Sequence, residues 1–146
     1  MDYFEDLEVG VTTVLPTSYL LTEEEILEFG RRFDPQPFHA DPEAAAASAF
    51  GGLVASTVHL FAIGVRMGMD QTPVAALSNL AMTDVVNHTP ARPGDLLSQE
   101  ATVTEKRLSE SRPGTGVVSF SAMLRNQRGE PVFSRVNVAL VSCRPT

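Results

Sequence analysis

The spacing of apolar residues predicts helices in the first half of the chain and strands in the second, with the change near residue 70. Residues 22–25 (Thr-Glu-Glu-Glu) read as a capping box, in which the threonine hydroxyl accepts from the last amide and the last carboxylate reaches back. Ile26, Phe29 and Phe33 follow at helical spacing and are predicted to face the core. Pro35 then ends this helix, because proline disfavours the helical conformation in the residue before it.

Two more helices are predicted before residue 70. Residues 41–43 (Asp-Pro-Glu) begin one, since they combine an N-cap, a proline at the first helical position and an acid in the first turn. Between residues 53 and 67 the apolar side chains do not keep to one stripe. A helix from about Ser56 to Met67 is therefore expected to be buried and surrounded by other structure.

The second half of the chain has the period-two alternation of strands. Apolar residues alternate between Val118 and Leu124, and after a turn at 126–129 the segment 132–141 returns, which predicts a hairpin. Further strands are predicted at the segments 11–20, 76–87 and 96–108. Five strands and one apolar helix predict an α+β fold, with an antiparallel sheet curled around the helix. The exposed edge of such a sheet predicts a homodimer or a higher homo-oligomer.

Length and composition narrow the functional classes. The 146 residues fit a single domain, 1–146, and the net charge of −7 argues against nucleic acid as a partner. No signal peptide and no apolar run of about 20 residues is present, so no membrane association is expected. The single cysteine, Cys143, cannot form an internal disulfide, which favours the cytoplasm. The three histidines are not clustered and no phosphate-binding or dinucleotide motif occurs, so neither metal nor cofactor is predicted.

Asp34 and His39 form the main candidate for chemistry. They lie five residues apart in the segment 33–39 (Phe-Asp-Pro-Gln-Pro-Phe-His), where two prolines predict a stiff loop that delivers the histidine. An acid and an imidazole held rigidly within an apolar frame suit general acid–base catalysis. The alternative is that Asp34 caps a turn and His39 lies at the surface.

Residues before the central helix form a second candidate. Backbone amides at a helix N-terminus stabilise negative charge on an oxygen, and Gly51-Gly52 would let a ligand approach the backbone closely. A plain flexible turn is the alternative. Ser56 lacks the flanking glycines of a nucleophile elbow and is interpreted as an N-cap. His59, inside the apolar helix, is interpreted as a core histidine.

Taken together, the chain resembles the MaoC-like acyl dehydratases, the (R)-specific enoyl-CoA hydratase group of the hot-dog fold. The most specific segment is 33–41, which looks like the hydratase motif with its aspartate and histidine five apart. The opening 3–10, the approach to the central helix at 50–56, and the turns at 92–95 and 126–130 also match. The resemblance covers nearly the whole chain.

The resemblance implies a hydro-lyase that acts on the C2–C3 bond of an acyl thioester, carried by coenzyme A or an acyl carrier protein, in fatty acid metabolism. Asp34 and His39 are then the acid–base pair acting on one water. Gly52, Ser56 and Thr57 are expected to bind the substrate, with a backbone amide at the thioester oxygen. For coenzyme A, basic residues such as Arg92, Arg107 or Arg112 are expected near the phosphates.

One position departs from the family pattern, and two other functions compete. Thr57 stands where the family commonly has glycine, so its side chain is expected to crowd a thioester, with strain if the position requires positive φ. A thioesterase usually presents a carboxylate from the central helix, but no acid lies between Leu53 and Met69. A non-catalytic acyl-binding partner subunit is the third interpretation.

Overall fold

The computed structural model describes residues 1–71 and 73–146 of the chain. Its helices are the 3-10 helix η1 (Phe4–Asp6), α1 (Glu23–Phe33), α2 (Pro37–Ala40), α3 (Pro42–Ala46) and α4 (Thr57–Gly68). Its strands are β1 (Thr12–Val14), β2 (Tyr19–Leu20), β3 (Ala76–Asn87), β4 (Leu96–Leu108), β5 (Thr115–Arg125) and β6 (Pro131–Ser142).

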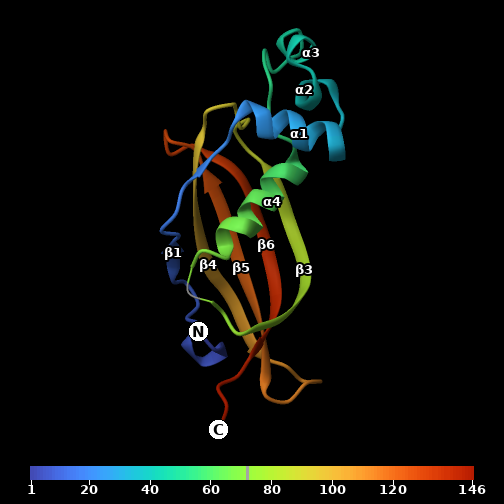
Figure 1. The fold of residues 1–146 in the computed structure, drawn as a ribbon. Helices are drawn as coiled ribbons and strands as arrows, with labels where there is room; N and C mark the ends of the chain where they lie inside the picture. Colours follow the sequence, from blue (N-terminus) through green and yellow to red (C-terminus); the bar gives the residue numbers. More distant parts are fainter. Residues whose placement is uncertain (72) are drawn as a thin grey trace.

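The strands form one antiparallel sheet in the order β1-β4-β5-β6-β3, and β2 pairs with β4 beside β1. Figure 1 shows α4 lying across one face of this sheet, with α1, α2 and α3 gathered at one end and both termini at the other. The predicted α+β class, with an antiparallel sheet packed against a central helix, is confirmed.

Most of the strand predictions are confirmed, and one is wrong. The segments 76–87 and 96–108 coincide with β3 and β4, and the hairpin of β5 and β6 turns at residues 126–129. The single strand predicted at 11–20 is instead two short strands, β1 and β2, which pair with different parts of β4. Pro16 lies between them, and proline has no N–H to donate to a continuous ladder.

Two expectations for α1 are corrected. Thr22 caps the helix by accepting from the Glu25 amide at 3.2 Å, but the Glu25 carboxylate accepts from the Tyr19 hydroxyl instead of reaching back. Phe33 is 58% exposed rather than in the core. It lies on the last turn of α1, where its ring contacts Phe29 and the Arg32 guanidinium, because the buried side of the helix covers only the end of α4.

The central helix α4 is buried on one face only. Leu60, Ile63 and Met67 pack against the sheet, whereas Val58 is 54% and Val65 39% exposed. The expectation of a helix surrounded on all sides is therefore wrong for the single chain, because the sheet covers one face. No helix in the described part of the chain is long and apolar enough to cross a membrane.

Candidate active site

Asp34 is placed by the end of α1. Its backbone amide donates to Gly30 at 2.9 Å and closes the last turn, and Pro35 stops the helix directly after it. The Asp34 Oδ1 accepts from the Gln36 side-chain amide at 3.1 Å. One carboxylate oxygen is thus held by a neighbour, and the other, Oδ2, is directed to His39.

His39 lies on a short helix rather than on the predicted loop, because Pro37 occupies the first position of α2 and favours a helical turn there. The residue is 7% exposed, which contradicts the surface alternative. Gly30 permits this packing, since a Cβ at that position would lie 2.2 Å from the His39 carbonyl oxygen. The His39 Nδ1 is 2.7 Å from the Val54 carbonyl oxygen.

The contact with Val54 determines which nitrogen of the His39 imidazole carries the proton. A carbonyl oxygen can only accept, so Nδ1 carries a proton and donates to it. In the neutral ring, Nε2 is then an acceptor with a free lone pair. This atom faces the Asp34 Oδ2 at 3.6 Å, which is longer than a direct hydrogen bond. Two acceptors at this spacing suit a molecule with two O–H donors, such as water.

A cavity of about 270 Å³ opens on this pair of side chains. It is lined by Asp34, Gln36, Phe38, His39, Phe50, Val54, Ala55, Thr57, Leu60, Asn87, His88, Thr89, Pro90 and Ala91. Its walls come from α2, the segment before α4, the first turns of α4 and the end of β3. Apolar side chains such as Phe38, Phe50 and Leu60 form part of this lining.

The three predicted substrate-binding residues take different places. Thr57 lines the cavity as the first residue of α4, and it is not one of the described residues with positive φ, so the expected strain does not arise. Ser56 is buried, and its hydroxyl caps α4 by accepting from the His59 amide, as predicted. Gly52 lies five residues before the helix, beside the Arg92 guanidinium, and is not among the described residues that line the cavity.

No sequence pattern singled out Asn87, and His88 was considered only as one of three histidines that are not clustered as in a metal site. They lie at the end of β3, and only the pairing of β3 with β6 brings them to the start of α4. The Asn87 Nδ2 donates to the Thr57 hydroxyl at 2.7 Å, and the His88 Nε2 lies 2.8 Å from the Ser134 hydroxyl. The one sequence signal that could have identified them is two adjacent polar residues at the end of a predicted strand.

Comparison with known proteins identifies the family. A family model described as a MaoC like domain matches residues 7–123. This chain belongs to the MaoC-like dehydratase family. A MaoC-like dehydratase from Rhodospirillum rubrum is 37% identical, with a TM-score of 0.91 and 99% of each chain covered.

Two more solved structures are similar to this MaoC-like chain. A protein described as a monoamine oxidase regulatory protein, from Archaeoglobus, is 28% identical with a TM-score of 0.86, over 98% of this chain and 95% of that one. The unliganded R-hydratase PhaJ1 from Pseudomonas aeruginosa is 21% identical with a TM-score of 0.71, over 98% of this chain and 86% of that one. The fold of the MaoC-like chain is the hot dog, as the resemblance implied.

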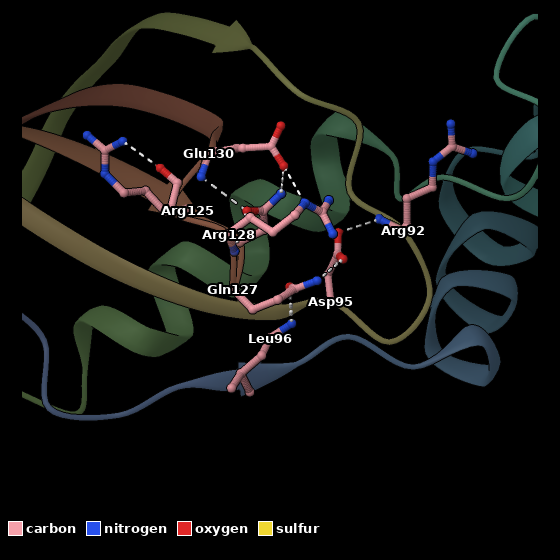
Figure 2. Close-up of polar contacts among 9 residues, drawn as sticks. Arg92, Asp95, Leu96, Arg125, Gln127, Arg128 and Glu130 are labelled. Atoms are coloured by element: carbon pink, nitrogen blue, oxygen red, sulfur yellow. Dashed lines mark hydrogen bonds and ion pairs between the residues drawn. The ribbon is translucent and has the colours of Figure 1, made fainter.

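A turn at residues 92–95 follows Pro90 and Ala91, which line the MaoC-like cavity. Figure 2 shows the Asp95 carboxylate between the Arg92 backbone amide, which donates at 2.9 Å, and the Gln127 side-chain amide, which donates at 3.1 Å. Gln127 in turn accepts from the Leu96 amide at 3.0 Å. Asp95 is buried, so these bonds tie the turn at 92–95 firmly to the β5–β6 turn.

Of the three arginines expected near a phosphate, only Arg92 lies by the MaoC-like cavity. Its guanidinium donates to the carbonyl oxygen of Phe50 at 2.5 Å, and Phe50 lines the cavity. Arg107 and Arg112 lie at the other end of β4, a strand of 13 residues that spans roughly 40 Å at about 3.3 Å per residue. Arg92 is therefore near the cavity, whereas Arg107 and Arg112 are far from it.

His59 is not among the described residues that line the MaoC-like cavity. It is buried, its ring stacks on Phe29 at a centroid distance of 4.5 Å, and its Nε2 is 3.4 Å from the Glu25 carboxylate. Burial away from water lowers the pKa of His59, while the negative charge of Glu25 opposes this shift. Partial burial, with Glu25 as hydrogen-bond acceptor, raises the pKa of Tyr19 to about 12. This polar cluster joins α1 to α4, the helices that carry Asp34 and Thr57.

Proposed function

We propose that this chain is a hydro-lyase that adds water to, or removes it from, the C2–C3 bond of a fatty acyl thioester. The observation that carries the proposal is the geometry of Asp34 and His39, two acceptors 3.6 Å apart at a cavity of about 270 Å³. The R-hydratase among the similar structures supports the reaction type. The substrate pair is a trans-2-enoyl and a 3-hydroxyacyl thioester, with coenzyme A or an acyl carrier protein as the carrier.

In the proposed reaction, one water lies between the Asp34 Oδ2 and the His39 Nε2 and donates to both. Its oxygen bonds to C3 of the enoyl group while the water loses a proton to this pair. The electron pair of the double bond moves towards the thioester carbonyl and forms an enolate, and a proton then returns to C2. Such positioned acid–base groups typically contribute about 10²–10⁴ in rate.

The enolate oxygen needs a donor at the other side of the cavity. The first amides of a helix have no carbonyl partner within that helix, and Thr57 is the first residue of α4. We therefore assign the Thr57 backbone N–H to the thioester oxygen, where an oxyanion donor is worth about 3–4 kcal/mol in other enzymes. The helix dipole adds to the stabilisation of negative charge at this end.

A single incubation with crotonyl-CoA tests the proposal. Loss of the enoyl absorbance without release of free thiol is the expected result. Thiol release without hydration would identify a thioesterase instead. Neither signal, over a series of acyl chain lengths and with both carriers, would favour a non-catalytic acyl-binding subunit.

We also propose that the active form is a homodimer paired along β3. Every residue of β3 except Met82 is exposed in the single chain, and the outer edge of this strand ends the sheet. Large apolar side chains are exposed along it at Leu77, Leu80, Val85 and Val86. Because β3 also supplies Asn87 to the cavity, a second copy on this edge would lie next to the site.

A further inference from the structure

We propose that the Thr57 side-chain hydroxyl is a second donor to the thioester oxygen, and that Asn87 orients it. This inference rests on the proposed hydro-lyase function and adds a catalytic group to it. Thr57 would then bind the enolate oxygen twice, through its backbone amide and through its hydroxyl, with both groups on the residue that begins α4.

The hydrogen bond between Asn87 and Thr57 fixes the role of the hydroxyl. The Asn87 Nδ2 donates to the Thr57 Oγ1 at 2.7 Å, so one lone pair of the hydroxyl oxygen is used as an acceptor. A hydroxyl has one proton of its own, and this proton cannot point along the same line towards the amide hydrogen. The proton of the Thr57 hydroxyl must therefore point away from Asn87.

The residues around Thr57 indicate the direction of its hydroxyl proton. Thr57 and Asn87 both line the cavity that contains Asp34 and His39. In the described part of the chain, the Oγ1 of Thr57 has no hydrogen-bond acceptor for its own proton. A thioester oxygen bound at the amide of Thr57 lies within the reach of the same residue's hydroxyl, which is two bonds removed from the Cα.

The chemistry favours such a donor. Negative charge develops on the carbonyl oxygen as the enolate forms, and donors aimed at that oxygen stabilise this charge. A hydroxyl that already accepts from Asn87 is polarised and becomes a better donor, because linked hydrogen bonds strengthen one another. Thr57, which lines the cavity, thereby supplies a group that glycine lacks.

Hydration of crotonyl-CoA by matched variants tests the role of the hydroxyl. Thr57→Val keeps the shape of the side chain and removes the hydroxyl, and we expect kcat to fall by about 10²-fold with little change in KM. Thr57→Ser returns the hydroxyl and should recover most of the lost turnover. Asn87→Asp should also lower kcat, because a carboxylate accepts the hydroxyl proton that the substrate would otherwise receive. Thr12→Val removes a hydroxyl on β1 that bonds to Thr102 away from the site and serves as the control.

A measurement without turnover separates this role from the proposed function. Butyryl-CoA has no double bond to hydrate, and the infrared stretch of its bound carbonyl should shift to lower frequency in the wild-type chain than in Thr57→Val. Equal turnover and equal carbonyl frequency in a folded Thr57→Val would overturn the role of the hydroxyl while leaving hydration intact. An absence of hydration by the wild-type chain would overturn the proposed function itself.

Discussion

At the scale of single residues, the site depends on which atoms are donors and which are acceptors. The Val54 carbonyl oxygen keeps the proton on the Nδ1 of His39, and Gln36 holds one oxygen of Asp34. The free atoms of the pair, Nε2 and Oδ2, therefore face each other as acceptors. This arrangement has no evident structural purpose, since two acceptors do not bond to each other.

Asp34→Asn and His39→Ala are each expected to lower kcat for hydration by about 10²–10⁴-fold, because each removes one of the groups that share the proton of the water. Steady-state rates with crotonyl-CoA measure the effect. Thermal unfolding followed by circular dichroism is the control, since both variants should keep the fold. Near-normal turnover in either variant would remove that residue from the site.

Arg92→Ala is expected to raise KM for crotonyl-CoA, because its guanidinium bonds to Phe50, which lines the cavity, and we expect the phosphates of the carrier to approach there. The matched substrate is the crotonyl thioester of N-acetylcysteamine, which has no phosphate. Its KM should change far less. An equal rise for both substrates would mean that Arg92 acts only by holding the Phe50 carbonyl in place.

At the scale of elements, the site is assembled where short helices meet at close range. The α1 helix approaches α2 so closely at Gly30 that no side chain fits between them. The segment before α4 is tied to α2 through the Val54 amide, which donates to the Phe38 carbonyl at 3.1 Å. These backbone contacts, rather than the two prolines alone, position His39.

Gly30→Ala is expected to lower both stability and turnover. Its Cβ would lie 2.2 Å from the carbonyl oxygen of His39, and a backbone atom cannot move aside without shifting α2. Overpacking of this kind typically costs about 1–3 kcal/mol. Gly68→Ala on α4 is the control, since the nearest atom would be 4.0 Å away. Chemical denaturation and crotonyl-CoA turnover are the measurements, and a fully active Gly30→Ala would contradict the argument.

The contact between α1 and α4 through His59 predicts a dependence of stability on pH. The pKa of His59 is lowered from 6.5 in the folded chain, so the unfolded chain takes up this proton first as the pH falls. The free energy of unfolding should therefore decrease below about pH 6.5. The slope from one proton is at most about 1.4 kcal/mol per pH unit.

The variant His59→Gln isolates this contribution, because glutamine remains polar beside Glu25 and does not titrate. Urea unfolding between pH 7 and pH 5 should show a shallower decrease for His59→Gln than for the wild-type chain. Identical slopes would show that another group causes the pH dependence.

At the scale of the whole molecule, two apolar surfaces stand out as uncovered among the residues that the structure describes. One is the row of side chains on β3, and the other is the outward face of α4 with Val58 and Val65. A sheet that ends in an unpaired apolar edge favours association with another chain. Because β3 borders the cavity, assembly and activity are expected to depend on each other.

Leu80→Arg is expected to convert the proposed homodimer to a monomer, since Leu80 is 52% exposed on β3 and a buried charge opposes pairing. Light scattering after size-exclusion chromatography measures the mass. Val14→Arg is the matched control, because Val14 is 67% exposed on β1 at the opposite edge of the sheet and should not affect assembly. A monomeric wild-type chain would refute the dimer.

The sequence predicted those features that depend on local order. Helix caps at Thr22, Asp41 and Ser56 are decided by neighbours within three residues, and the sequence located all three. The limits of β3 and β4 were also predicted, since alternation and flanking turns act within one strand. The order of residues in the motif at 33–41 is enough to single out Asp34 and His39 as the candidate pair.

Tertiary structure decided what depends on contacts between distant segments. Only the fold shows that Glu25 pairs with His59 instead of completing its capping box, that Phe33 is exposed, and that Asn87 reaches Thr57 across 30 residues. The physical reason is that local pattern fixes which side of an element is apolar, but not which element covers it. The sequence thus named the candidate acid and base, and the packing of α1, α2, α4 and β3 set the cavity in which they meet.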